Sequence, residues 1–288
     1  MISAVIREKL RDPSYLDQHM IAAAIVRDIG KVPWYDAHFL ARFEAAKRYL
    51  AMVRPDVLSE FVAGFAPLRP PAGFKVREID RLFEPHQFAA MLEIARSIPD
   101  NRLELHEIAD FGRNVVHDHE YYTQVQAQIV PLVSELAGRE LEPGYNFLSL
   151  YGADGRCDPH MDEPEAMYTL DICLDQSGPW PIHFSNIVDW PDATLMQGWD
   201  PRSVLADPAI TFTPYALEPN KAILFNGSSQ WHYRDSIAPG GFCTLLFMHY
   251  FPKGCGDLVR PRFWARHFGW AELEPLCDIF AEAYDRTS

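Results

Sequence analysis

The segment "DPHMDEP" (residues 158–164) places a histidine and an aspartate two positions apart, soon after the apolar run "FLSLYG". In a β-strand, side chains at positions i and i+2 point to the same face. His160 and Asp162 can therefore offer a metal ion one imidazole nitrogen and one carboxylate oxygen side by side. The spacing alone arises often by chance, and a hydrogen-bonded pair in a loop is the alternative interpretation.

A second histidine from a distant strand would complete such a site. His232 fits this requirement, because it follows "NKAILFNGSSQW", which has the pattern of an apolar strand ending in a tight polar turn. Two histidines and one carboxylate make a facial triad, which occupies three coordination positions of Fe(II) and leaves the others open. An antiparallel barrel can bring the two strand ends to one mouth.

The elements around these residues indicate a mixed helical and β protein. Residues 14–30 and 36–54 have helical spacing, with Ser14 expected as an N-cap. Three prolines in "APLRPPAGF" place a boundary near residue 70. Further helices are expected over 84–98 and 119–138. From Tyr145 onward, short strands with turn signals indicate a sandwich or barrel, and a helix ends the chain.

Composition narrows the class of protein. The 288 residues carry a formal net charge of −14, so we expect no nucleic-acid partner. No apolar stretch approaches the roughly 20 residues that span a bilayer, and the first ten residues contain charges, so we expect neither a membrane segment nor a secretory signal. The five cysteines form no CxxC pair and are expected to be reduced thiols. Together these features predict a cytoplasmic protein.

The order of the pieces resembles the Fe(II)- and 2-oxoglutarate-dependent dioxygenase superfamily, especially its prolyl-hydroxylase-like branch, over about residues 75–255. "FLSLYGADGRCDPHMD" is similar to the strand that leads into the HxD motif of that branch, and "ALEPNKAILFNGSSQWH" to the strand, glycine turn and distal histidine. The resemblance implies an α+β fold, with a double-stranded β-helix (jelly-roll) domain over residues 71–288, supporting helices and a C-terminal helix. Residues 1–70 form a helical extension.

The resemblance also implies the cofactors and their ligands. Fe(II), 2-oxoglutarate and O2 are expected, with His160, Asp162 and His232 as the iron ligands. The activity would be hydroxylation, or another oxidation, of an unactivated C–H bond in an amino acid, a peptidyl side chain or a small natural product. Asp162 favours hydroxylation over halogenation, because the related iron halogenases carry a small residue in its place.

One departure from the family concerns the cosubstrate. The usual Arg or Lys on the last barrel strand, which pairs with the distal carboxylate of 2-oxoglutarate, is absent from "GFCTLLFMHYF". Arg234, which forms an R-x-S pair with Ser236, is the favoured replacement, and a surface salt bridge to Asp235 is its alternative role. Other options are Arg156, Lys221, or a cation-free set of Thr244, His249 and Tyr151.

Further cosubstrate candidates have ordinary structural alternatives. Tyr151 and Tyr168 either reach the cosubstrate carboxylate or are core aromatic residues, and Asn146 either bonds 2-oxoglutarate or bonds its strand neighbours. His249 is expected to be a core residue. The pair His117 and His119 in "VVHDHE" is expected in a polar turn.

Three questions stay open at this stage. The long insertion over residues 187–215 carries Trp190 and Trp199, and Trp180 lies nearby; they form either a lid over the iron site or a packed satellite cluster. Residues 1–70 recognise a peptide, form a homodimer or buttress the barrel. A zinc hydrolase with Glu163 or Glu165 as base, and a non-catalytic barrel that binds a small molecule or peptide, are the rival functions.

Overall fold

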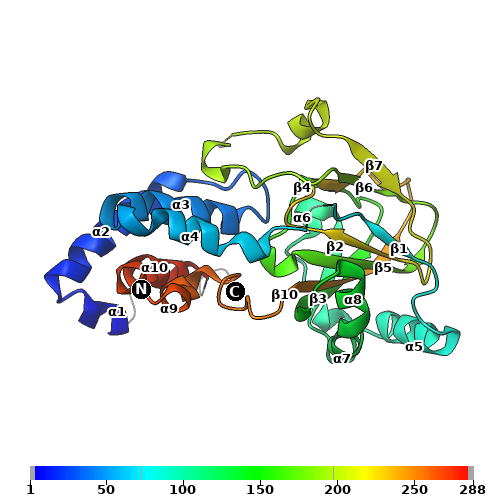
Figure 1. Cartoon of the computed structure of the whole chain (residues 1–288). Coiled ribbons are helices and arrows are strands. Elements are labelled where there is room, and N and C mark those ends of the chain that lie inside the picture. Colours follow the sequence, from blue (N-terminus) through cyan, green and yellow to red (C-terminus); the bar gives the residue numbers. More distant parts are fainter. Residues whose placement is uncertain (1–3, 72, 197, 285–288) are drawn as a thin grey trace. The chain divides into compact units, whose positions relative to one another are not determined.

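The computed structural model describes residues 4–71, 73–196 and 198–284 (Figure 1). The chain divides into two compact units. One comprises Met1–Arg69, Trp190–Asp200 and Gly254–Ser288, and the other comprises Pro70–Asp189 and Pro201–Lys253. The first unit is helical and the second contains the strands, so we call them the helical unit and the barrel unit.

The helical unit is built from helices at both ends of the chain. Its helices are α1 (Ala4–Lys9), α2 (Pro13–Ile29), α3 (His38–Val53), α4 (Leu58–Gly64), α9 (Trp264–Phe268) and α10 (Glu274–Tyr284). The N-cap of α2 is Asp12 and not Ser14, because the Asp12 side chain accepts a bond from the Ser14 backbone N–H at 2.9 Å. Proline at the first position of α2 fits this cap.

Aromatic packing explains why the C-terminal segment groups with the N-terminal helices. Trp264 lies edge-on to Phe39, Phe61 and Phe65, with ring centroids 5.2–5.6 Å apart. Burial of such large rings is a strong stabilising contribution. The sequence placed the C-terminal helix with the barrel, whereas the structure groups it with the helical unit.

The tryptophans of the long insertion belong to the same aromatic core. Trp190 packs edge-on against Phe39 and Phe43, at 5.5 and 5.7 Å. Trp199 packs against Trp34 at 6.4 Å. Of the two alternatives left open for Trp190 and Trp199, the structure shows the packed cluster, within the helical unit.

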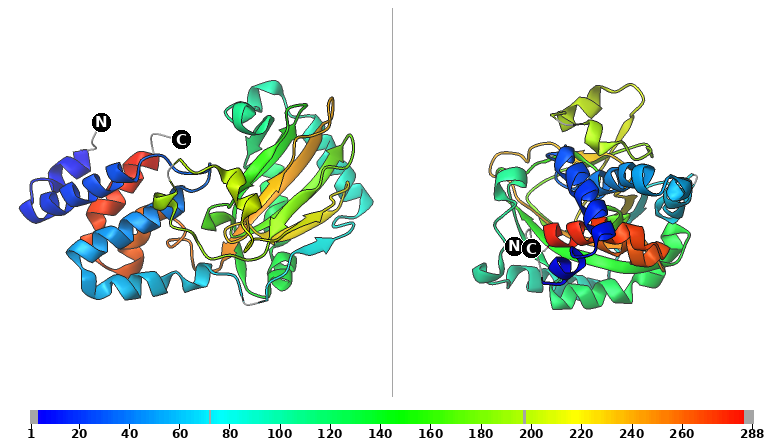
Figure 2. Two further views of the ribbon diagram at one scale, coloured as in Figure 1. Left: turned by 90° about the horizontal axis from the view of Figure 1, so that it is seen from above. Right: turned by 90° about the vertical axis from the view of Figure 1, so that its left-hand side faces the viewer.

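The barrel unit contains two antiparallel sheets (Figure 2). Its strands are β1 (Arg77–Ile79), β2 (Arg113–His117), β3 (Leu141–Tyr151), β4 (Cys157–His160), β5 (Tyr168–Gln176), β6 (Ile182–Ser185), β7 (Phe212–Tyr215), β8 (Ala222–Asn226), β9 (His232–Arg234) and β10 (Cys243–Pro252). The six-stranded sheet has the order β1-β8-β5-β10-β3-β2, and the four-stranded sheet has the order β4-β9-β6-β7. From β3 onward the chain crosses repeatedly between the sheets, which is the topology of a double-stranded β-helix. The predicted fold class is confirmed.

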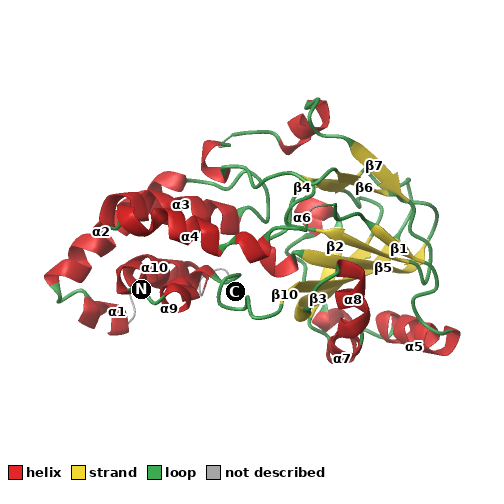
Figure 3. Ribbon diagram, in the orientation of Figure 1, coloured by secondary structure: helices red, strands yellow, loops and turns green. Residues whose placement is uncertain are grey.

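Helices cover one face of the six-stranded sheet (Figure 3). They are α5 (Pro85–Arg96), α7 (Glu120–Gln128) and α8 (Val130–Ala137), with the short α6 (Ile108–Phe111) beside β4. Leu148, Leu170 and Leu246 point to this outer face and join one hydrophobic cluster with the helices. Phe147 and Leu245 alternate with them and point inward, where they form a second cluster with the four-stranded sheet.

One strand was missed by the sequence analysis. His117 was expected in a polar turn, but it is the last residue of β2, which pairs with β3 at the edge of the six-stranded sheet. The alternation of β2 places Arg113, Val115 and His117 on the inner face. Among the described residues, no helix is both long enough and apolar enough to cross a membrane.

Candidate metal centre and barrel interior

The pairing of β4 with β9 brings the two predicted histidines together. His160 lies opposite His232 in the antiparallel register, and their ring centroids are 4.1 Å apart. Asp162 follows β4 directly, and its Oδ1 lies 3.5 Å from His160 Nε2 and 3.3 Å from His232 Nε2. One ligand atom from each residue lies within 4.8 Å of the others. The structure thus forms the cluster that the sequence predicted.

Both histidines are oriented by the backbone of their own strands. His160 Nδ1 lies 2.9 Å from the carbonyl oxygen of Asp158, and His232 Nδ1 lies 3.0 Å from that of Gln230. A carbonyl oxygen only accepts, so each Nδ1 carries the proton. In its neutral form each ring therefore has its lone pair on Nε2, which faces Asp162. This arrangement is typical of histidines that bind a metal.

Asp162 is held in a narrow space. Its Oδ2 accepts a hydrogen bond from Thr169 Oγ1 at 3.1 Å. A Cβ on Gly227 would lie 2.2 Å from Asp162 Oδ2 and 2.5 Å from the Ala166 carbonyl oxygen, so only glycine fits at that turn. Burial by itself would raise the pKa of Asp162, but the positive charges that His232 and His160 carry when they are protonated outweigh it and hold this pKa well below its usual range.

Arg234 lies inside the barrel, two positions after His232. Its Nη2 donates to Asp171 Oδ2 at 2.7 Å, its Nη1 donates to the Trp180 carbonyl oxygen, and the guanidinium lies 4.8 Å from the Trp180 ring centroid. The Arg234 side chain is 2% exposed. A surface salt bridge to Asp235 is therefore wrong, and the favoured cation candidate does face the interior.

A second buried arginine was missed by the sequence analysis. Arg113 pairs with Glu107, and its Nη1 donates to the Tyr151 hydroxyl at 2.7 Å. Arg113 and Cys243 both lie opposite Tyr151 in the register, so β2 supplies a cation in the same row as the start of β10. "RNVVH" shows no period-two alternation, because Val115 and Val116 are both apolar, so no clear signal in the sequence marked Arg113 as an interior residue.

Tyr151 contacts Arg113 directly and contacts Arg234 through the Trp180 ring. Its ring packs edge-on against Trp180 at 4.7 Å, while its hydroxyl accepts from Arg113. Burial raises the pKa of Tyr151, so the phenol stays protonated. Of the predicted cosubstrate residues, the structure brings Tyr151 and Arg234 to the barrel interior.

Two other candidates lie on the outer face. Asn146 Nδ2 donates to Gln126 Oε1 at 2.9 Å and to Thr123 Oγ1 at 3.0 Å, both on α7. Tyr168 packs within the outer hydrophobic cluster, 5.6 Å from Phe74. Strand alternation is the reason, because each residue is one position out of phase with the interior side chains of its strand.

Four further candidates also lie outside the interior. Thr244 stands between Cys243 and Leu245, which point inward, so its own side chain points to the opposite face. Ser236 is exposed in the loop after β9. Arg156 donates to the Ala109 carbonyl oxygen at 3.0 Å. Lys221 pairs with Glu78 at 2.5 Å.

His249 lies on the inner face near the metal cluster. It is 3% exposed, its Nδ1 lies 3.0 Å from Thr169 Oγ1, and its ring centroid is 4.3 Å from that of Tyr145. Burial lowers the pKa of His249 to about 4, so its imidazole is neutral at neutral pH. The core position expected for His249 is therefore found, with a polar contact toward the site.

These residues fit a metal and an anionic cosubstrate. Two neutral imidazoles and one carboxylate are the donor set of the facial triad for Fe(II). Two buried guanidinium groups and a phenol supply the donors that a carboxylate needs. This fit rests on the oriented Nε2 atoms and on the glycine that makes room for Asp162.

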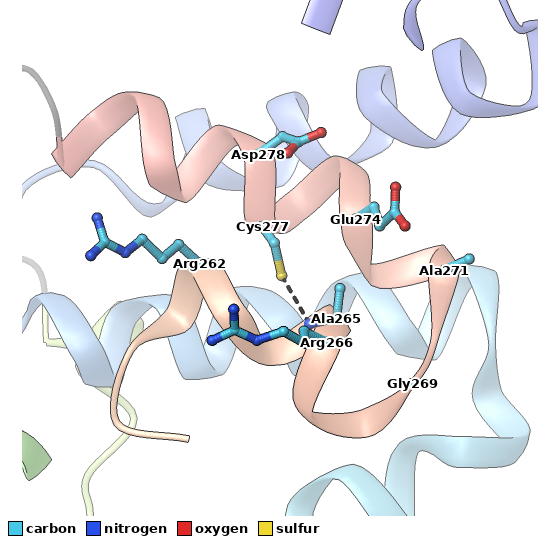
Figure 4. A pocket seen from close by; sticks show the side chains of 8 residues that line it. All are labelled: Arg262, Ala265, Arg266, Gly269, Ala271, Glu274, Cys277 and Asp278. Carbon is cyan, nitrogen blue, oxygen red and sulfur yellow. Dashed lines mark hydrogen bonds between the residues drawn. The ribbon is translucent and has the colours of Figure 1, made fainter. Parts of the chain in front are cut away.

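The helical unit has a surface pocket of a different kind (Figure 4). Its lining residues are Arg262, Ala265, Arg266, Gly269, Ala271, Glu274, Cys277 and Asp278. Arg266 pairs with Asp257, and Asp278 pairs with Lys9 at 2.8 Å. Burial raises the pKa of the Cys277 thiol to about 12, which makes it unreactive. This pocket offers no comparable set of metal donors.

Comparisons with known proteins give matches in structure alone. No protein-family model matches the chain, and no curated protein matches its sequence. The non-heme alpha ketoglutarate dependent epimerase SnoN from nogalamycin biosynthesis is 12% identical, with a TM-score of 0.44, over 72% of this chain and 90% of its own. The chain resembles the Fe(II)/2-oxoglutarate-dependent oxygenases in fold.

Two further solved structures have the same relationship to this chain. HygX from Streptomyces hygroscopicus, with nickel and 2-oxoglutarate bound, is 10% identical over 67% of this chain and 86% of its own, with a TM-score of 0.46. A Pseudomonas putida prolyl-4-hydroxylase is 11% identical over 63% and 95%, with a TM-score of 0.44. At such low identity these likenesses concern the fold, and the site must be argued from its own residues.

Proposed function

We propose that the protein is an Fe(II)- and 2-oxoglutarate-dependent oxygenase that hydroxylates, or otherwise oxidises, an unactivated C–H bond. The observation that carries this proposal is the convergence of His160 Nε2, His232 Nε2 and Asp162 Oδ1 at one mouth of the barrel. Both rings are already turned with their lone pairs toward the carboxylate. A metal that binds these three atoms gains ligands that need no reorientation.

The three side chains would hold the iron, and the rest of the site would prepare it. Three ligands leave half of an octahedral sphere open for 2-oxoglutarate and O2. When bound, Fe(II) with 2-oxoglutarate activates O2 and releases succinate and carbon dioxide. The chain's own part is to fix the metal, orient both substrates and limit the access of water through its apolar interior.

Arg234 is the proposed partner of the distal carboxylate of 2-oxoglutarate, with Arg113 and Tyr151 beside it. The observed contacts of Arg234 use two of its five N–H donors, so donors remain for a second carboxylate. The Tyr151 hydroxyl contacts Arg113, and the Tyr151 ring contacts Trp180, which in turn contacts Arg234, so this hydroxyl can donate its proton to the same anion. β9 and β2 would then supply the cations that β10 lacks.

The substrate is proposed to be an amino acid, a peptidyl side chain or a small natural product, all of which carry unactivated C–H bonds. Peptide recognition or homodimer formation by the helices of residues 1–70, and a cytoplasmic location, stay predictions.

The decisive experiment measures metal content and cosubstrate turnover together. The protein is prepared anaerobically, loaded with Fe(II) and assayed for conversion of 2-oxoglutarate to succinate, with and without O2. We expect slow O2-dependent succinate formation by the wild type and by Thr244→Val, which faces away from the site, and none by His160→Ala. Tightly bound zinc without O2-dependent turnover would favour the hydrolase instead, and a chain that binds no metal would favour the binding module.

A further inference from the structure

A line of three polar side chains runs from the metal cluster along the inner face of the six-stranded sheet. Thr169 Oγ1 lies 3.1 Å from Asp162 Oδ2 and 3.0 Å from His249 Nδ1. Thr169 and His249 are paired in the register of β5 and β10, so the sheet itself fixes their separation. Thr169 is 1% exposed and His249 is 3% exposed, so water does not compete strongly for these bonds.

The direction of each hydrogen bond follows from the groups involved. Thr169 Oγ1 has one proton, and it also lies 3.2 Å from the carbonyl oxygen of Ala166. The Asp162 carboxylate and the Ala166 carbonyl only accept, so Thr169 donates its proton toward them, and the shorter contact and the negative charge favour Asp162 Oδ2 as the acceptor. Thr169 therefore accepts from His249, whose Nδ1 must carry the proton. The neutral imidazole thus anchors the hydroxyl, and the hydroxyl anchors the carboxylate.

This line distinguishes the two oxygens of Asp162. Oδ2 is held by Thr169 and confined by Gly227, whereas Oδ1 is the oxygen that lies near both Nε2 atoms. We propose that Thr169 and His249 are positioning residues that restrict Asp162 to one-oxygen coordination of the metal. The inference rests on the proposed function, and it explains how three positions on the metal stay open. Without Thr169 the carboxylate can rotate and offer both oxygens.

Titration of the metal-free protein with Co(II), followed by its visible absorption bands, tests the proposal without any turnover. Thr169→Val keeps the shape of the side chain and removes the hydroxyl. We expect about 10-fold weaker Co(II) binding, as is usual when the partner of a metal ligand is lost, together with an altered band pattern. Thr169→Ser should restore both the affinity and the spectrum, and Thr244→Val, a threonine on the opposite face, should match the wild type.

A second variant keeps the test decisive if Thr169→Val does not fold. His249→Phe retains a ring against Tyr145 but loses the Nδ1 proton. We expect its Co(II) affinity to fall, but by less than the affinity of Thr169→Val. Equal affinity and spectrum in wild type, Thr169→Val and His249→Phe would overturn the inference while leaving the metal site intact. Failure of Thr169→Ser to restore binding would also overturn it. A wild type that binds no Co(II) would instead remove the proposed function and the inference together.

Discussion

The two faces of the six-stranded sheet use the same strands for opposite purposes. The outer face carries leucines and aromatic residues covered by α5, α7 and α8. The inner face carries buried polar groups between its apolar residues, namely Arg113, Thr169, Asp171 and His249. Adjacent residues on a strand point to opposite faces of the sheet. A residue that packs against the helices is therefore followed by one whose side chain faces the candidate site.

The energetics of the two faces differ accordingly. Burial of apolar side chains stabilises the outer face by about 25 cal/mol for each Å² removed from water. The Arg234–Asp171 pair on the inner side is 2% and 0% exposed, and such a pair is weak evidence for stability because desolvation offsets its attraction. Burial indeed raises the pKa of Asp171 despite the nearby Arg234. The buried ion pair of the inner face therefore contributes less to stability than the apolar packing of the outer face.

The largest functional effect is expected when one of the proposed metal ligands inside the barrel is removed. His232→Ala deletes one of the two imidazoles, and we expect O2-dependent succinate formation to fall below detection and Fe(II) binding to be lost. Metal content after anaerobic loading and succinate release measure both effects. The melting temperature of the metal-free variant should stay close to that of the wild type. Retained turnover would exclude His232 from the ligand set.

Gly227→Ala tests the space around Asp162. The new methyl group would overlap Asp162 Oδ2, which lies 2.2 Å from the ideal Cβ position, so the carboxylate must move. We expect Fe(II) affinity to fall by about 10-fold to 100-fold, the range for a displaced or unsupported ligand. Isothermal titration with Fe(II) under nitrogen measures it. Wild-type affinity in Gly227→Ala would show that the turn can relax without moving Asp162.

Arg234→Ala separates cosubstrate binding from metal binding. We expect the KM for 2-oxoglutarate to rise at least 10-fold while Fe(II) affinity changes little. Loss of the guanidinium leaves Asp171 buried without its partner, so the free energy of unfolding should also fall by about 3–5 kcal/mol. The double variant Arg234→Ala with Asp171→Ala should recover part of that stability but not the KM. If the folded variant has an unchanged KM for 2-oxoglutarate, Arg113 and not Arg234 would be the partner of the distal carboxylate of 2-oxoglutarate.

The smallest functional effect is expected on the outer face. Asn146→Ala removes the bonds to Gln126 and Thr123, which leaves the buried Gln126 Oε1 on α7 without this donor, whereas the exposed Thr123 can bond water. We expect a loss of about 1–3 kcal/mol in the free energy of unfolding and no change in the KM for 2-oxoglutarate. Urea denaturation and the succinate assay measure the two quantities. A large rise in KM would mean that the faces are not functionally separate.

Individual residues show which parts of the candidate site could be predicted from the sequence. The triad was predicted because its members occupy motifs next to recognisable strands, and β4 and β9 do bring them together. Tyr168, Asn146 and Thr244 were chosen by residue type, and each proved to be on the outer face. Arg113 was missed because β2 is a short edge strand whose pairing with β3 is decided by contacts distant in sequence. Trp190 and Trp199 joined the helical unit for a similar reason.

The sequence by itself predicted most of the local elements, the apolar strands, a sandwich or barrel and the motif residues that meet at its mouth, and the family resemblance specified the double-stranded β-helix. Spacing along a strand is a local property, so the HxD pair could be interpreted without coordinates. The tertiary structure alone decided which residues face the interior, that two arginines from β2 and β9 lie there, and that Thr169 and His249 support Asp162. These facts depend on strand register and on contacts between residues distant in sequence. Arg113 and Tyr151 are 38 residues apart, and Thr169 and His249 are 80 residues apart, and no local pattern encodes such pairings.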